Sequence, residues 1–119
     1  MSQEHIKHIF ATLDTLQVED FAAFFTEDGQ MRNGNAAPIV GRSSIRDTFE
    51  QGFKPVLKAL HHEIIGLWEE DDVVIVESIV HYTRKDDRII TLPAVSILRM
   101  AGDNIREYRV YMDIGPVFA

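Results

Sequence analysis

Three short polar links divide the second half of the chain, and they constrain its fold more than any other feature. The links are Glu70-Asp71-Asp72, Lys85-Asp86-Asp87 and Ala101-Gly102-Asp103-Asn104. They separate apolar, strand-like segments, which we predict at about 60–70, 73–84, 88–100 and 105–113. Links this short join antiparallel neighbours, because a parallel crossover needs many more residues. The second half is therefore expected to form an antiparallel meander.

The first half of the chain carries helical patterns instead. Ser2 is a good N-cap residue, and it precedes a predicted helix that ends near Gln17. The apolar residues of this helix recur at helical spacing: Ile6, Ile9, Phe10, Leu13 and Leu16. A shorter apolar stripe over residues 18–25 predicts a second helix, closed by a turn at Glu27-Asp28-Gly29.

A third helix is predicted with Ser43 or Ser44 as its cap and Pro55 at its end. Its apolar face would carry Ile45, Phe49 and Phe53. Three helices followed by an antiparallel meander are typical of an α+β fold, in which the helices pack on one face of a curved antiparallel sheet. The length of 119 residues suits one core, so we expect a single domain over residues 1–119.

The predicted second strand is apolar on both faces, at Val73-Val74-Ile75-Val76 and at Ile79-Val80. A strand with only one buried face alternates more cleanly between apolar and polar residues. No further segment remains to cover the second face, so a second copy of the protein is the simplest cover. We therefore expect a homodimer that forms through the sheet.

Composition excludes several classes of partner and site. The formal net charge is −7 and the pI is near 5.1. Nucleic-acid and anionic-membrane partners need clusters of Lys and Arg along the sequence, which are absent, so neither partner is expected. Without cysteine there is no disulfide and no thiolate nucleophile. No apolar run approaches the roughly 18 residues that span a bilayer, and we expect a cytoplasmic protein.

The last predicted strand supplies the candidate catalytic residues. Alternate residues of a strand share a face, so Arg109, Tyr111 and Asp113 are expected to project together. The opposite face would then carry Tyr108, Val110 and Met112. A carboxylate beside a phenol is a possible acid/base site. The same pattern also describes the solvent-exposed face of an ordinary strand, so both interpretations stay open.

Three motifs follow one another along the chain. They are Phe24-Phe25-Thr26-Glu27-Asp28-Gly29, Gly41-Arg42-Ser43-Ser44-Ile45, and Asp103-Asn104-Ile105 leading into 108–113. In this order and spacing they resemble the SnoaL-like branch of the nuclear transport factor two-like superfamily. The resemblance implies a cone-shaped barrel, in which a strongly curved antiparallel sheet and helices surround a central pocket. Polyketide cyclases, ketosteroid isomerases and epoxide hydrolases share that fold, so the fold alone does not identify the reaction.

The resemblance also implies roles for single residues. Asp113 and Asn33 match the carboxylate and the amide that position a water in limonene epoxide hydrolases. The other residues of that site are replaced here by Ser78, Val80 and Met31. The ketosteroid isomerase positions are occupied by Ile9, Val95 and Arg32. Polyketide cyclases need one acid/base group on the pocket wall, and we assign this catalytic role to Asp113, with Tyr111 beside it.

Substrate contacts are expected from four further residues. Arg32 and Asn33 would bind a carbonyl or carboxylate at the mouth of the cone, although Asn is also an ordinary turn former. Arg109 either steers an anionic ligand, holds Asp113, or pairs with a glutamate at position 77 or 107. Trp68 is expected to line the pocket or the core.

Histidines are the remaining candidates for chemistry. The rings of His61 and His62 should point to opposite faces of a strand, and His5 and His8 lack a third ligand of suitable spacing, so no metal and no cofactor are expected. Two functions stay open. One is a cyclase or isomerase that acts by acid/base chemistry on a small apolar carbonyl compound. The other is a non-catalytic dimeric module that binds a small molecule or a partner protein.

Overall fold

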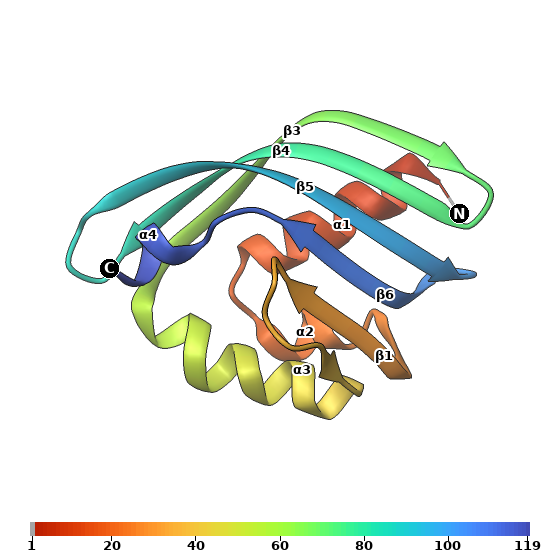
Figure 1. The fold of residues 1–119 in the computed structure, drawn as a ribbon, viewed down its shortest axis with the longest axis horizontal. Coiled ribbons are helices and arrows are strands. Elements are labelled where there is room, and N and C mark those ends of the chain that lie inside the picture. The colour runs from red at the N-terminus through yellow and green to blue at the C-terminus, as the bar shows by residue number, and fades with distance from the viewer. Residues whose placement is uncertain (1) are drawn as a thin grey trace.

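A six-stranded mixed sheet forms the larger layer of an α+β fold (Figure 1). The structure is a computed structural model that describes residues 2–119. In spatial order, the strands are β2 (Ile39–Val40), β1 (Phe25–Asn33), β6 (Asn104–Tyr111), β5 (Ile89–Ala101), β4 (Val73–Arg84) and β3 (Leu57–Glu70). The sheet is curved but open, because β2 and β3 remain as separate edges. The sheet therefore curves over the helical layer but does not close into a barrel.

The predicted antiparallel meander is confirmed for β3, β4, β5 and β6, each of which pairs with the next along the chain. Its links contain Asp71, Asp87 and Gly102 in the left-handed conformation, with φ of 54°, 70° and 61°. Asp and Gly tolerate this conformation, which explains their place in the turns. Strand β6 ends at Tyr111 rather than near residue 113, so Asp113 lies beyond the sheet.

The turn predicted at Glu27-Asp28-Gly29 is wrong, because these residues lie inside β1. Strand β1 pairs in parallel with β6, and its register shifts between Phe25 and Gln30. The polar segment is thus an irregularity within a strand, of the kind that a bulge produces. A Cβ on Gly29 would lie only 3.1 Å from the carbonyl oxygen of Ile105, which favours glycine there. The prediction of a purely antiparallel sheet missed this parallel pair.

The helices are α1 (Gln3–Asp14), α2 (Val18–Ala22), α3 (Arg42–Thr48) and α4 (Gly115–Phe118). Helix α3 continues into a π-helical turn (Phe49–Phe53) and a 3₁₀ turn (Lys54–Val56) before β3 begins. The short helix α4 was not predicted. Between residues 2 and 119, none of the helices has the length and apolar character needed to cross a membrane.

The cap of the first helix is as predicted, but two other boundaries are not. The Ser2 Oγ accepts a hydrogen bond from the backbone N–H of His5 at 3.2 Å. Helix α1 ends at Asp14, because Leu16 has a φ of 61° that a helix cannot continue. Gly41, with a φ of 97°, occupies the cap position of α3 in place of the predicted serines.

All of the longer helices lie on one side of the curved sheet (Figure 1). We call the sheet face that they cover the inner face, and the opposite one the outer face. Fully buried side chains from both layers form the core; the largest are Tyr108, Phe10, Phe21 and Phe25. The aromatic rings of Phe21 and Phe25 meet edge to face at 5.4 Å, a geometry that adds to the gain from burial. The outer face has no covering helix among the described residues.

Candidate functional site

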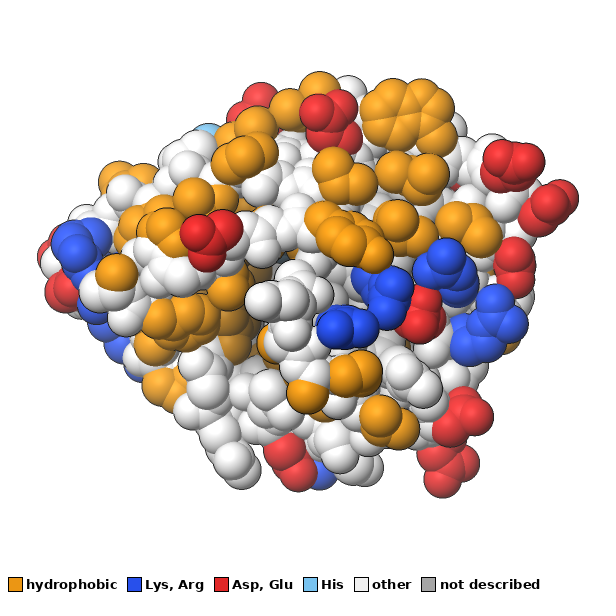
Figure 2. Space-filling view, in the orientation of Figure 1, with side chains coloured by type: hydrophobic (Ala, Val, Ile, Leu, Met, Phe, Trp, Pro, Cys, Tyr) orange, Lys and Arg blue, Asp and Glu red, His pale blue; other side chains and the backbone are white. Residues whose placement is uncertain are grey.

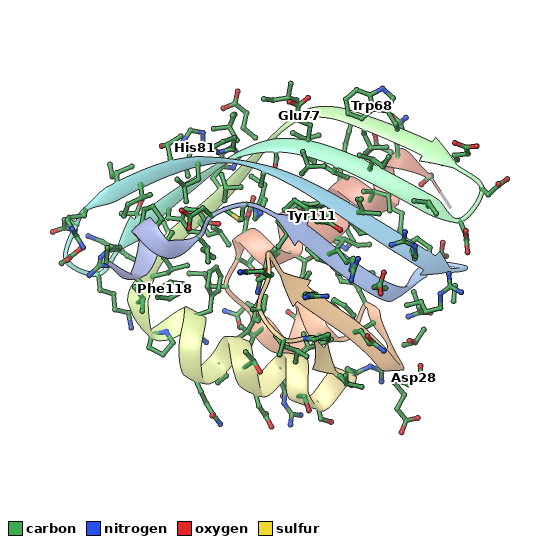
Figure 3. The ribbon with its side chains drawn as sticks, viewed as in Figure 1. Asp28, Trp68, Glu77, His81, Tyr111 and Phe118 are labelled. Carbon is green, nitrogen blue, oxygen red and sulfur yellow. The ribbon has the colours of Figure 1, made fainter. Side chains whose placement is uncertain are left out.

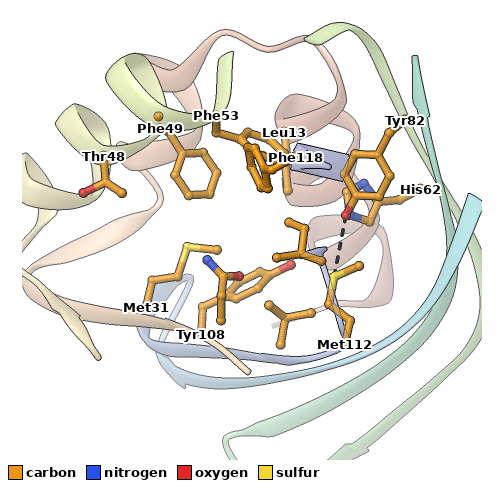
Figure 4. A pocket seen from close by; sticks show the side chains of 14 residues that line it. Leu13, Met31, Thr48, Phe49, Phe53, His62, Tyr82, Tyr108, Met112 and Phe118 are labelled. Atoms are coloured by element: carbon orange, nitrogen blue, oxygen red, sulfur yellow. Dashed lines mark hydrogen bonds between the residues drawn. The ribbon is translucent and has the colours of Figure 1, made fainter. Parts of the chain in front are cut away.

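A cavity of about 200 Å³ lies between the inner face and the helical layer (Figure 4). Its walls are dominated by aromatic side chains: Phe49, Phe53, Tyr82, Tyr108 and Phe118. Asn33, Thr48 and His62 are its main polar lining residues besides the two phenols. Thr48, Gly52 and Phe118 are exposed, which places the mouth of the cavity between the end of α3 and the C-terminal helix.

The π-helical turn shapes one wall of the cavity. It brings Phe49 and Phe53 to the same wall, with ring centroids 5.2 Å apart. A Cβ on Gly52 would meet no atom within 4 Å, so the glycine leaves open space at the mouth. Single π-helical turns inside α-helices occur frequently at functional sites. The turn therefore marks this cavity as the first candidate site.

Asp14 and His62 form a hydrogen-bonded pair at the cavity. The ring Nδ1 of His62 lies 2.6 Å from Oδ1 of Asp14, and the backbone N–H of His62 donates to Oδ2 at 2.9 Å. The side chain of His62 is only 9% exposed and that of Asp14 only 17%. A carboxylate only accepts hydrogen bonds, so Nδ1 carries the proton in the neutral ring. The other nitrogen, Nε2, then has a lone pair.

The surroundings hold the imidazole of His62 in place. Its ring packs against Phe10 with centroids 5.2 Å apart. His62 lies on the edge strand β3, and Asp14 is the last residue of α1. Nε2 makes no hydrogen bond to any residue between 2 and 119, and His62 lines the cavity. An oriented imidazole with a vacant nitrogen at an apolar wall is a suitable general base.

Tyr82 faces the same cavity and supplies a proton donor. Its hydroxyl donates only to the Sδ of Met112, at 3.6 Å, and a thioether is a weak acceptor (Figure 4). Burial, reinforced by Tyr108 and by the charge of Asp14, raises the pKa of Tyr82 above its usual value. The phenol therefore keeps its proton and can donate to a better acceptor, such as a carbonyl oxygen.

Tyr108 is more completely enclosed. Its hydroxyl lies 3.3 Å from the Oγ of Ser96, and burial raises its pKa despite that hydrogen bond. Tyr108 is 2% exposed and packs against Phe10 and Phe21. Its ring forms part of the floor of the cavity, and its hydroxyl is already engaged.

Asn33 is the one residue of the predicted site that lines this cavity. The expectation that Tyr111 faces the pocket is wrong: Tyr111 is 50% exposed on the outer face. Asp113 is also exposed and does not line the cavity. Its Oδ1 accepts a hydrogen bond from the backbone N–H of Gly115 at 3.0 Å, so it caps α4. Tyr111 and Asp113 do border one shallow groove at the end of β6, outside the cavity.

The remaining predicted contacts also lie away from the cavity. Trp68 is 55% exposed on the outer face, where its ring lies over Gly66. Arg109 lies within 3.9 Å of Glu107 and donates to the Tyr111 hydroxyl at 3.3 Å. Arg32 donates through Nε to the carbonyl of Ala36 at 2.8 Å. Both arginines border a second hollow, on the outer face.

The sequence interpretation missed Asp14, His62 and Tyr82. Asp14 and His62 are 48 residues apart, and no motif joins them. The available signal was strand alternation: Tyr82 shares its face of β4 with Val80, and β3 pairs Leu60 with Tyr82 and His62 with Val80. This register places His62 and Tyr82 on one face, once the pairing of the strands is known.

A model of the SnoaL-like domain family matches residues 6–108. The match confirms the resemblance drawn from the motifs. No match was found among curated protein sequences.

Solved structures with the same fold cover nearly the whole chain. A hypothetical protein from Catenulispora acidiphila with a ketosteroid isomerase-like fold, solved in complex with trimethylamine, is 18% identical at a TM-score of 0.86, covering 98% of this chain and 91% of that chain. SalBIII, an epoxide hydrolase/cyclase-like enzyme in the formation of the pyran ring of salinomycin, is 18% identical at a TM-score of 0.81, and the match covers 95% of this chain and 91% of that chain. A proposed SnoaL-like polyketide cyclase from Jannaschia is 15% identical at a TM-score of 0.77, and the match covers 97% of this chain and 87% of that chain. Identities this low show the fold alone.

Proposed function

The chain belongs to the SnoaL-like domain family, and we propose that its cavity performs acid/base chemistry on a small apolar carbonyl compound, as a cyclase or isomerase. The observation that carries the proposal is the Asp14–His62 pair, with 2.6 Å between Oδ1 and Nδ1, at the wall of an apolar cavity. We assign the acid/base role to His62 rather than to Asp113, because Asp113 lies outside the cavity and caps α4.

The size of the cavity limits the substrate. A cavity of about 150 Å³ holds one benzene molecule, so about 200 Å³ suits a compound with a single ring. Aromatic walls favour a flat and largely apolar body, and the few polar groups would orient it. A carbonyl oxygen of the substrate would replace the sulfur of Met112 as the acceptor of the hydrogen bond from the Tyr82 hydroxyl. The Asn33 amide would provide a second polar contact.

The proposed reaction needs no group beyond these residues. Nε2 of His62 removes a proton from the carbon next to the carbonyl, and the electron pair of that C–H bond forms the enolate. The Tyr82 O–H stabilises the charge that develops on the oxygen. Asp14 stabilises the imidazolium that is formed. If a C=C bond adjoins that carbon, the enolate extends over it, and return of the proton from His62 to the far carbon of the dienolate moves the double bond and gives an isomer. Alternatively, the enolate carbon attacks a second carbonyl of the same molecule, which closes a ring, and the alkoxide that forms takes the proton from His62.

The relatives support this reaction class by analogy. SalBIII is described as an epoxide hydrolase/cyclase-like enzyme, and the Jannaschia protein as a proposed polyketide cyclase. Both cover most of this chain. Because one fold hosts many reactions, the residues on the walls of the cavity decide the chemistry.

Deuterium exchange tests the proposal without a known product. One-ring ketones and 1,3-diketones are incubated with the protein in D₂O, and NMR follows the loss of the proton next to the carbonyl. We expect the protein to accelerate exchange, and His62→Gln to lower this acceleration by about 10²–10⁴ while ligand affinity is kept. The matched control is His8→Gln, at an exposed histidine of α1, which should exchange like the unaltered protein.

Two results would count against an enzyme. One is the absence of acceleration with every compound in the panel, and the other is equal exchange by His62→Gln and His8→Gln. Binding of the same compounds without exchange would support the second candidate, a non-catalytic binding module.

We also propose that the protein is a homodimer that forms through the outer face. Such a dimer is compatible with an enzyme and with a binding module. Large apolar side chains gather there: Trp68, Ile75 and Val95, which are 55%, 38% and 38% exposed (Figures 2 and 3). A monomer rarely exposes so many large apolar groups on one surface. A two-fold axis through this face would bury the same patch on both copies.

A further inference from the structure

Arg32 and Arg109 stand side by side on the outer face. They are direct register partners on the parallel strands β1 and β6, about 4.8 Å apart as neighbouring strands are. Like charges on directly opposite residues destabilise a sheet. A third arginine, Arg99 on β5, pairs with Glu107, two residues before Arg109 on the same face. The outer face thus carries three guanidinium groups on adjacent strands.

One carboxylate, that of Glu107, lies near two of these three arginines. The Oε1 of Glu107 lies 2.8 Å from NH1 of Arg99 and 3.9 Å from Nε of Arg109. Arg32 forms no ion pair with any residue between 2 and 119. The cluster therefore keeps an excess of positive charge, in a chain whose net charge is −7. Figure 2 shows the basic side chains gathered beside the apolar patch of this face.

A hollow of about 220 Å³ lies between the two arginines. Arg32, Gly34, Asn35, Arg109, Val110 and Tyr111 line it, and none of them is acidic. Nε of Arg32 is fixed on the carbonyl of Ala36, so its terminal amino groups stay available. The Tyr111 oxygen accepts a hydrogen bond from Arg109, which leaves its own proton to donate. The hollow is lined mainly by hydrogen-bond donors.

We propose that the hollow between Arg32 and Arg109 binds a small oxyanion, a phosphate or a carboxylate. An oxyanion would relieve the repulsion between the two guanidinium groups, which favour the planar, forked geometry of these ligands. The Tyr111 hydroxyl and the Asn35 amide add neutral donors. The site is separate from the cavity, on the opposite face of the sheet, and it does not depend on the proposed reaction.

An NMR titration with two probes tests the site. Amide resonances of residues 32–35 and 108–111 are followed while sodium phosphate or sodium acetate is added, with sodium chloride at matched ionic strength as the reference. We expect saturable shifts with at least one oxyanion and none with chloride. Saturation by phosphate alone identifies a phosphate site, by acetate alone a carboxylate site, and by both a general oxyanion site; each of these outcomes supports the proposal.

Variants separate a built site from general attraction. Arg109→Gln and Arg32→Gln should each weaken oxyanion binding by about tenfold or more, because each removes a charge-assisted contact. The matched control is Arg106→Gln on the same strand, where the exposed arginine pairs with Asp72 at 3.1 Å. It removes the same charge and should change affinity by less than about twofold. Equal weakening by all three variants, or shifts that chloride reproduces, would overturn the proposal. Two independent site variants keep the test valid if one fails to fold.

Discussion

Asp14 accepts two hydrogen bonds from one residue, His62: one from the ring Nδ1 at 2.6 Å and one from the backbone N–H at 2.9 Å. The backbone contact provides an acceptor for the N–H of His62 at the free edge of β3, where no further strand pairs. The ring contact sets the orientation and the tautomer of the imidazole. One carboxylate therefore joins the end of α1 to the edge of the sheet and prepares the cavity histidine.

This double role predicts a stability cost for Asp14→Ala. The substitution leaves the partly buried N–H and ring N–H of His62 without their acceptor, so we expect the free energy of unfolding to fall by about 2–3 kcal/mol. Urea denaturation measures the change. The control is Glu69→Ala, at an exposed position of the same strand, which should cost less than about 0.5 kcal/mol. Equal costs would show that Asp14 does not join α1 to β3.

The buried phenols predict a loss of stability at alkaline pH. Burial raises the pKa values of Tyr82 and Tyr108 in the folded chain, whereas the unfolded chain releases both protons at about pH 10. Below that pH neither state loses them, and above it only the unfolded state does, so the free energy of unfolding decreases as the pH rises. Tyr82→Phe should lessen this decrease by up to about 1.4 kcal/mol per pH unit. Parallel denaturation curves for both proteins between neutral and alkaline pH would contradict the prediction.

The helical layer depends on Phe49. Phe49 is 5% exposed, and its ring stacks on Phe21 with centroids 5.5 Å apart. Phe49→Ala should therefore lower the free energy of unfolding by about 3–5 kcal/mol. Ile89→Ala, at a side chain that is 71% exposed, should cost less than about 1 kcal/mol. A loss below about 1 kcal/mol for Phe49→Ala would mean that the π-helical turn is not packed as described.

The proposed dimer predicts a specific effect of charge on the outer face. Val95 lies within the apolar patch and is 38% exposed. Val95→Asp would bury a carboxylate in the interface, so sedimentation at micromolar concentration should change from dimer to monomer. Val40→Asp, at a 58% exposed position on the short strand β2, should leave the dimer intact. A monomeric unaltered protein would exclude the interface.

Local sequence patterns predicted most of the helices and strands. Elements that form through contacts distant in sequence were missed. The short links predicted the order of β3 to β6, because turn residues such as Asp71 set the backbone conformation locally and so make consecutive strands neighbours. Strand β1 escaped notice, since Asp28-Gly29 has the composition of a turn, and the strand exists through its parallel pairing with β6. Helix α4 is too short to leave a periodic signal.

The site was predicted in part, because strand alternation does not say which face is the inner one. Tyr108 and Tyr111 were correctly placed on opposite faces of β6. From the sequence, the face with Arg109, Tyr111 and Asp113 was assigned to the pocket. The face of the sheet that the helices cover is instead the apolar one, and Tyr108 lies there. Asn33 lines the cavity at the position that the resemblance implied, and its contact with a substrate stays a prediction. Asp14 was not predicted, since its place at the cavity depends on the docking of α1 against β3.

A pair of variants decides between the catalytic group expected from the sequence and the one that the cavity contains. Asp113→Asn keeps a side chain that can cap α4, and the residue lies outside the cavity, so exchange should stay within about threefold of the unaltered protein. His62→Gln should lower exchange by about 10²–10⁴, because it removes the proposed base. Both variants are compared in the same deuterium-exchange assay, with unfolding curves to confirm that they fold. The opposite order of effects would return the catalytic role to Asp113 and place the chemistry in the groove at the end of β6.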